Sequence, residues 1–304
     1  MFGFSNKVGA GISKEQAAKR NYFDIFGRHF WGILGASFLY TLSNAVFFIA
    51  AILLFRAYFT GDNLVHAVSN ILTGKNFSVP FVPFIPFMLI GPFTAGFTYV
   101  IRNFAKQEHT FITSDFFSHS KKNAKQGIIV SIISTIVFFL LIQAFVFYNS
   151  FFMQNGLPLG ILYILFFIVL ALYIITMFYI YPIMVTFKMS LKVIVKNAWT
   201  FAVLKLPQNF IIFLLLIIIN FGLLFLMCFV IYLPISVYLL VLGFFLTGFT
   251  SFTANYYIWH VMNKYIVSLV TKNSDDDKIF NDDEYPDFDD DYNEEVLPED
   301  EYLL

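Results

Sequence analysis

The sequence predicts an all-α protein, a polytopic membrane helix bundle with six transmembrane helices and interfacial helices at its cytoplasmic face. Hydrophobic residues make up 59% of the 304 residues and charged residues only 13%, whereas a soluble domain carries about 25% charged residues. One soluble core cannot enclose so much apolar surface, so lipid must solvate a large part of it. The apolar residues also fall into six runs, each long enough to cross a hydrocarbon layer of about 30 Å as a helix.

The six runs define a predicted membrane domain at residues 31–273. A cytoplasmic segment, residues 1–30, precedes it and contains an expected interfacial helix, and a strongly acidic tail, residues 274–304, follows it. Only Pro234 separates the last two runs, so we expect them to form a tight helical hairpin. The predicted transmembrane helices span residues 31–55, 79–101, 127–148, 158–185, 209–233 and 235–259.

The distribution of basic residues predicts the orientation of the bundle. All but two of the 19 Lys and Arg residues fall in the N-terminal segment, in the second and fourth connections between spans, or after the last span. The two exceptions, Arg56 and Lys75, lie in the opposite connections. Because basic loops stay on the cytoplasmic side, we expect a multi-pass protein of the cell membrane with both termini in the cytoplasm.

Two cytoplasmic connections have the pattern of amphipathic helices. In the 186–205 connection lysines recur every four residues, and apolar residues such as Ile194 and Ala198 cover the other side. Such a helix lies with its apolar face in the acyl boundary and its lysines on anionic lipid headgroups. The 110–126 connection repeats the pattern. We name the predicted lipid-binding or partner-binding residues the lysine surface: Lys121, Lys122, Lys125, Lys188, Lys192 and Lys196.

The second span contains a candidate broken-helix site formed by Pro86, Gly91, Pro92 and Gly96. Proline removes a backbone donor and frees carbonyl groups, and broken helices at mid-membrane often line the substrate sites of transporters. The alternative is a kinked helix whose small residues let neighbouring helices approach closely. We favour the kinked helix.

The strongest polar groups inside the spans are side-chain amides. They either line a path for a solute or form hydrogen bonds between helices, and the second use is the more common one. These residues are Asn44, Gln143, Asn220 and Asn255.

The spans lack the residues that most membrane chemistry requires. None contains Asp, Glu, Lys, Arg or His, so proton-coupled and voltage-driven mechanisms lose their usual carriers, and a nucleophile with an activating base is absent. The single cysteine, Cys228, excludes an internal disulfide. Outside the spans, Asp115 and His119 lie one helical turn apart, and we interpret them as solvated charges rather than metal ligands. We therefore expect no enzyme activity, no cofactor and no nucleic-acid partner.

Three segments resemble the YesL family of uncharacterised bacterial membrane proteins. They are the run IGPFTAG at residues 90–96, the run from DFF to KN at 115–123, and the run from SLK to KNAW at 190–199. The resemblance covers roughly residues 20–270. It implies a bacterial cell membrane, and because some members are encoded beside carbohydrate-uptake systems, it implies an accessory role in sugar import. The family has no established catalytic residues to carry over.

Two functions remain open at this point. The first is a non-catalytic accessory or scaffold protein that works through the lysine surface, with the lipid bilayer, its anionic headgroups and a membrane transporter complex as partners. The second is a transporter or channel for a neutral small solute.

The acidic tail adds a further expectation. Residues 275–304 hold 15 acidic residues and one lysine, a net charge of −14, and this charge density predicts disorder. Because the tail is predicted on the same side of the membrane as the lysine surface, it either stays solvated or covers that surface by electrostatic attraction.

Overall fold

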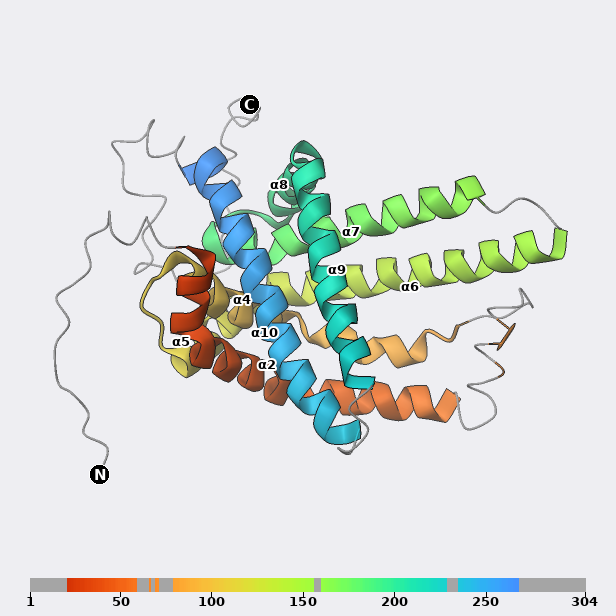
Figure 1. Cartoon of the computed structure of the whole chain (residues 1–304), viewed down its shortest axis with the longest axis horizontal. Coiled ribbons are helices and arrows are strands. Elements are labelled where there is room, and N and C mark those ends of the chain that lie inside the picture. The colour runs from red at the N-terminus through yellow and green to blue at the C-terminus, as the bar shows by residue number, and fades with distance from the viewer. Residues whose placement is uncertain are drawn as a thin grey trace.

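The computed structural model describes residues 21–58, 66, 69–70, 79–155, 160–228 and 235–267. Every principal element in these ranges is helical, as the sequence predicts (Figure 1). Residues 1–20 and the acidic tail lie outside the described residues, so the predicted boundaries of both segments stay predictions.

Within the described ranges, three helices are long and apolar enough to cross a membrane. They are α2 (Tyr22–Tyr58), α6 (Ala124–Asn155) and α7 (Gly160–Thr186). Their outer sides expose large apolar residues at helical spacing, an arrangement that suits lipid rather than water. On α2 this row, more than half exposed, consists of Leu42, Val46, Ile49 and Leu53.

Two bent helix pairs raise the number of candidate spans among the described residues to five. The pair η1 (Val82–Leu89) and α4 (Gly91–Lys106) is bent by 47°, and the pair α8 (Leu191–Leu204) and α9 (Leu206–Cys228) by 90°. The last long helix, α10 (Ile235–Met262), has described side chains only from residue 243 on. The structure therefore supports three to five spans in these ranges, and the count of six stays a prediction.

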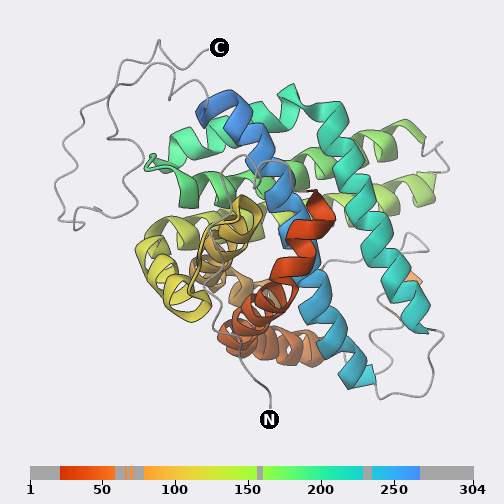
Figure 2. The ribbon, with the colours of Figure 1, turned by 60° about the vertical axis from the view of Figure 1, so that its left-hand side comes forward.

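The helices run along two main directions. In Figure 1, α6 and α7 lie along the long axis of the molecule, whereas α9 and α10 cross that axis steeply, and Figure 2 shows the same relation after rotation. The first turns of α2 also run in a different direction from the rest of that helix in both views. Residues 22–30, which we expected in an interfacial helix, are thus continuous with the first span but bent away from it.

Helix α4 is the centre of the fold. It packs against α2, α5, α6, α7 and α10, and most of its side chains are buried. One core cluster, around α7, α8 and α10, includes Ala95 of α4. A second, around α2, α5 and α10, includes Phe97, Ile101 and Phe104 of α4. Because both cores share α4, the residues at its C-terminal end are fixed between them.

Candidate functional site

The apolar side of helix α8 is buried inside the protein. Ile194, Ala198 and Ala202, spaced by four residues, have no exposed area and belong to the core cluster around α7 and α10. The helical spacing predicted that Ile194 and Ala198 lie in the acyl boundary of the membrane. That interpretation is wrong, because this side of α8 packs inside the protein, mainly against α7.

The opposite side of α8 carries the lysines. Lys192 and Lys196 are exposed, and Lys188 is exposed just before the helix begins. Trp199 and Val203, 51% and 47% exposed, lie on the same side as Lys192 and Lys196, since these positions follow the three- and four-residue spacing of one helix face. This face therefore combines positive charge with apolar area.

The start of α6 and the end of α5 carry the other lysines. In α5 (Ile112–Lys122) Lys121 is exposed and Lys122 half-buried, and Lys125 in the first turn of α6 is exposed. Phe116, fully buried in the core cluster beside α4, anchors α5. Packing of this apolar side holds the lysines at the surface.

One hydrogen bond joins the two lysine groups. The Nε2 atom of Gln126 donates to the carbonyl oxygen of Met189 over 3.1 Å, which links the start of α6 to the turn before α8. Lys125 and Lys188 are the chain neighbours of this bonded pair. The bond therefore joins the two segments that carry the lysines, which are separate in the sequence.

The acidic side chains of Glu108 and Asp115, in the same region, have partners outside the lysine surface. Glu108 forms an ion pair of 2.6 Å with Lys106, and the Oδ2 atom of Asp115 accepts a hydrogen bond of 2.8 Å from the backbone amide of Phe111, at the start of α5. Among the described residues, no group of three or more His, Cys, Asp and Glu side chains is placed to hold a metal ion.

His119 is not the solvated charge that the sequence suggests. Its side chain is buried, and its ring stacks on the Tyr99 ring with 3.3 Å between centroids. The pKa of His119 falls from 6.5 to about 3. Burial of the imidazole is the largest cause, and the positive charges of Lys122 and Arg102 act in the same direction. The imidazole is therefore neutral at physiological pH and packs as part of the interior.

Arg102 also has a different environment from the one expected. We counted it among the cytoplasmic cations, but it is 2% exposed. Its guanidinium donates to Asn103 Oδ1 from Nε (3.1 Å) and Nη2 (2.7 Å), and from Nη1 to the carbonyl oxygen of Val185 (2.8 Å) and Thr186 Oγ1 (3.1 Å). It also lies 4.6 Å from the centre of the Tyr99 ring. These contacts bind α4 to the end of α7.

The candidate broken-helix site lies where η1 meets α4. Pro86 is buried within η1, and Gly91 and Pro92 form the first turn of α4. A Cβ atom on Gly91 would lie 1.9 Å from the carbonyl oxygen of Gly127, and one on Gly96 would lie 2.1 Å from Ser120 Oγ. Glycine at both positions therefore allows α6 and α5 to touch the α4 backbone.

Side chains of α6 bind backbone groups near this break and ahead of η1. The hydroxyl of Ser131 donates to the carbonyl oxygen of Met88 in η1. The Gln143 amide accepts from the Val79 backbone amide over 3.4 Å and donates to the Val79 carbonyl oxygen. This geometry fits the kinked-helix alternative, in which the break serves close packing.

The polar amides predicted in the spans divide into two kinds. Gln143 and Asn220 bond between elements, the latter through its Nδ2 to Thr250 Oγ1 (2.9 Å) in α10. Asn44 and Asn255 instead donate from Nδ2 to carbonyl oxygens one turn earlier in their own helices. The expected bonding between helices is thus confirmed for Asn220, whereas Gln143 binds Val79, which precedes η1 and is not helical.

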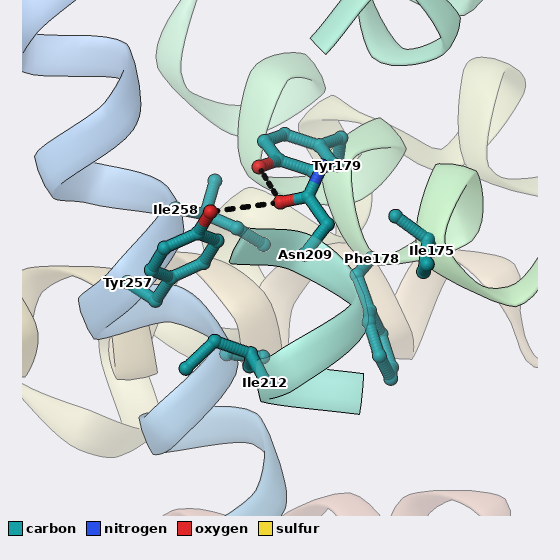
Figure 3. Close-up of a pocket in the computed structure, with 8 residues that line it drawn as sticks. Ile175, Phe178, Tyr179, Asn209, Ile212, Tyr257 and Ile258 are labelled. Atoms are coloured by element: carbon teal, nitrogen blue, oxygen red, sulfur yellow. Dashed lines mark hydrogen bonds between the residues drawn. The ribbon is translucent and has the colours of Figure 1, made fainter. Parts of the chain in front are cut away.

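A buried polar cluster that the sequence analysis missed centres on Asn209 (Figure 3). Its Oδ1 accepts hydrogen bonds from the hydroxyls of Tyr179 (2.7 Å) and Tyr257 (2.9 Å), and its Nδ2 donates to the carbonyl oxygens of Phe201 (2.9 Å) and Ala202 (3.0 Å). The cluster ties α7, α8, α9 and α10 together. Asn209 opens the predicted fifth span, and its sequence neighbours give no signal for this role.

A small pocket lies beside the cluster. Its lining is apolar, and it has room for roughly one water molecule. Since Asn209 already uses both its donor and its acceptor groups, the pocket offers little to orient a polar solute. It is lined by Ile175, Phe178, Tyr179, Asn209, Ile212, Ala254, Tyr257 and Ile258.

Long apolar helices, exposed apolar rows and a kinked helix pair define the class: a helical protein suited to insertion in a membrane. A family model described as "Protein of unknown function, DUF624" matches residues 67–145. This match spans the break before α4, all of α4 and α5, and most of α6. No curated protein and no solved structure matches the chain.

Proposed function

We propose that the protein is a non-catalytic accessory or scaffold protein of the bacterial cell membrane that binds anionic lipid headgroups, or an acidic partner, through its lysine surface. The proposal includes six spans with both termini in the cytoplasm. The observation that supports it is the Gln126–Met189 hydrogen bond, which joins the start of α6, beside Lys125, to the turn before α8, beside Lys188.

The exposed side of α8 supports this function. Lys192 and Lys196 share that side with Trp199 and Val203, and a tryptophan beside lysines suits the boundary between headgroups and acyl chains. Each lysine near an anionic membrane contributes about 1 kcal/mol. Lys188, Lys192 and Lys196 together therefore favour anionic over neutral lipid by at most about 3 kcal/mol, less at high salt.

The identity of the partner rests on resemblance. The segments 90–96, 115–123 and 190–199 resemble the YesL family, and this resemblance supports a carbohydrate-uptake transporter as the protein partner. Co-purification with chemical crosslinking tests the partner: a stable transporter complex supports the scaffold function. Solute flux through liposomes that contain only this protein would instead favour a transporter or channel for a neutral solute.

Lipid binding is tested by lipid retention. The full chain and its Lys188→Gln, Lys192→Gln, Lys196→Gln triple variant are reconstituted in nanodiscs of mixed neutral and anionic lipid, and the lipids that stay bound after extraction are quantified. We expect the triple variant to retain several-fold less anionic lipid at about 50 mM salt, because the screening length is then longest. The matched Lys→Arg triple variant should retain as much as the wild type. Equal retention by the Gln variant would contradict lipid binding by α8.

A further inference from the structure

The described chain ends beside the C-terminal end of α8. After α10, a short π-helix, η2 (Asn263–Val267), carries Tyr265 against the end of α8. The Tyr265 ring centre lies 6.5 Å from that of Phe201 and 4.8 Å from the Nζ atom of Lys205. Phe201 lies in the last turn of α8 and Lys205 directly follows it. The chain therefore continues toward its C-terminus from the end of the lysine-bearing helix.

The chain beyond this point carries the opposite charge. Residues 275–304 hold 15 acidic residues and one lysine. The first acidic residue, Asp275, is eight positions beyond Val267, a stretch that spans at most about 27 Å when fully extended. Helix α8, with 14 residues, is about 21 Å long. The first acidic residues can therefore reach any lysine of α8.

We infer that the acidic segment 275–304 docks on the lysine surface and covers it, in competition with anionic lipid headgroups. The tether holds the segment near the surface at an effective concentration on the order of millimolar. Each exposed ion pair is weak, so docking is collective and falls with ionic strength. The competition with lipid rests on the proposed function, whereas the docking itself does not.

The apolar content of the segment fits the same surface. Trp199 and Val203 of α8 are half exposed beside the lysines. Aromatic residues recur through the acidic segment, so the segment offers apolar contact as well as charge; they are Phe280, Tyr285, Phe288, Tyr292 and Tyr302.

Disulfide formation within the full chain tests docking. In a Cys228→Ser background, which removes the single native cysteine, Val195→Cys places a thiol on the exposed side of α8 and Asn281→Cys places one in the acidic segment. Neither change alters a charge. At about 50 mM salt we expect the pair to oxidise several-fold faster than at about 500 mM.

A matched variant separates attraction from mere tethering. In the same cysteine pair, Asp282→Asn, Asp283→Asn, Glu284→Gln and Asp287→Asn remove four charges but leave the chain length unchanged. We expect this variant to oxidise several-fold more slowly at low salt and to lose its salt dependence. Equal rates in the charged and neutralised chains would overturn the docking.

Lipid retention tests the competition separately. In nanodiscs, the full chain with the neutralised segment should retain several-fold more anionic lipid than the wild type. Fast, salt-sensitive oxidation with unchanged lipid retention would overturn the competition. Failure of the proposed function would give a different result. In chains with the neutralised acidic segment, the Lys188→Gln, Lys192→Gln, Lys196→Gln change would then leave lipid retention unaltered.

Discussion

The guanidinium of Arg102 donates a 2.8 Å hydrogen bond to the carbonyl oxygen of Val185, one residue before α7 ends. The last carbonyl groups of a helix lack partners within the helix and carry partial negative charge. A buried cation at this position satisfies two needs at once, since Arg102 gains an acceptor and α7 gains a cap. The contact also fixes the central helix α4 relative to α7 next to the lysine surface.

Replacement of Arg102 by Gln should destabilise the protein by about 3 kcal/mol, because Val185, Thr186 and Asn103 lose a charged donor in a buried place. Arg102→Lys should recover only part of the loss, since a lysine cannot reproduce the planar fork that binds Asn103 and Val185 together. Thermal unfolding in detergent measures both. The exposed Arg28→Gln serves as control, and a loss at Arg28 equal to that at Arg102 would contradict the capping role.

Substitution by alanine should destabilise the protein far more at Gly91 and Gly96 of α4 than at Gly27 of α2. Gly91→Ala and Gly96→Ala should each cost about 2 kcal/mol or more, because the added Cβ meets backbone or hydroxyl atoms of α6 or α5 at about 2 Å. Gly27→Ala should be neutral or stabilising by up to about 1 kcal/mol, since nothing lies within 4 Å of its added Cβ. The midpoints of thermal unfolding rank the three variants. Tolerance of alanine at Gly96 would show that α5 does not touch α4 there.

The Asn209 cluster should behave as a cooperative unit. Asn209→Leu leaves two tyrosine hydroxyls and two carbonyl oxygens without this partner, and we expect a cost of about 2–4 kcal/mol. Tyr257→Phe removes a single bond and should cost about 1 kcal/mol. The double variant should cost less than the sum of the two, because the bond is lost only once. Additive losses in a double-mutant cycle would contradict the shared bond.

Acid should weaken the packing of α5 through His119. Its pKa in the folded protein, about 3, lies below the ordinary 6.5, so between these pH values the unfolded chain binds the proton more readily and stability falls as the pH drops. By pH 5 the loss is at most about 2 kcal/mol. His119→Phe keeps an aromatic ring against Tyr99 but does not titrate, so the difference between wild type and variant should shift with pH below 6.5. Parallel pH profiles would rule out the buried neutral imidazole.

The orientation of the bundle is open to labelling. In the Cys228→Ser background, cysteines introduced at Lys75 and Asn155 should react with a membrane-impermeant thiol reagent added to intact cells. Cysteines at Lys122 and Lys196 should react only after the cells are opened, because the basic connections are predicted to lie in the cytoplasm. Labelling of Lys196→Cys in sealed cells would reverse the topology and remove the lysine surface from the cytoplasm.

Patterns within short stretches were enough to predict several features. The length of the apolar runs predicts helices that match α2, α6 and α7, because a span is a local property of about 20 residues. Proline and glycine in the second span predict its break, and the η1–α4 bend lies at Ile90, directly before Gly91. The four-residue spacing of Lys188, Lys192 and Lys196 likewise predicts a helix with one basic side, because helical periodicity alone decides which residues share a face.

Contacts between distant segments could not be predicted in this way. His119 and Arg102 have the charge of cytoplasmic loop residues, yet packing of α4 against α5 and α7 buries both. Asn209 resembles any amide at the start of a span until α7 and α10 bring two tyrosine hydroxyls to it.

The amino-acid sequence by itself determined the all-helical class, the apolar spans, the kink before α4 and the basic side of α8, since each depends on the period or composition of one segment. Only the tertiary structure decided which side of α8 is buried, that α4 lies at the centre, and that Gln126 and Met189 join the two lysine groups. The physical reason is that burial and hydrogen bonding depend on neighbours from other helices, and local periodicity does not specify which helices those are.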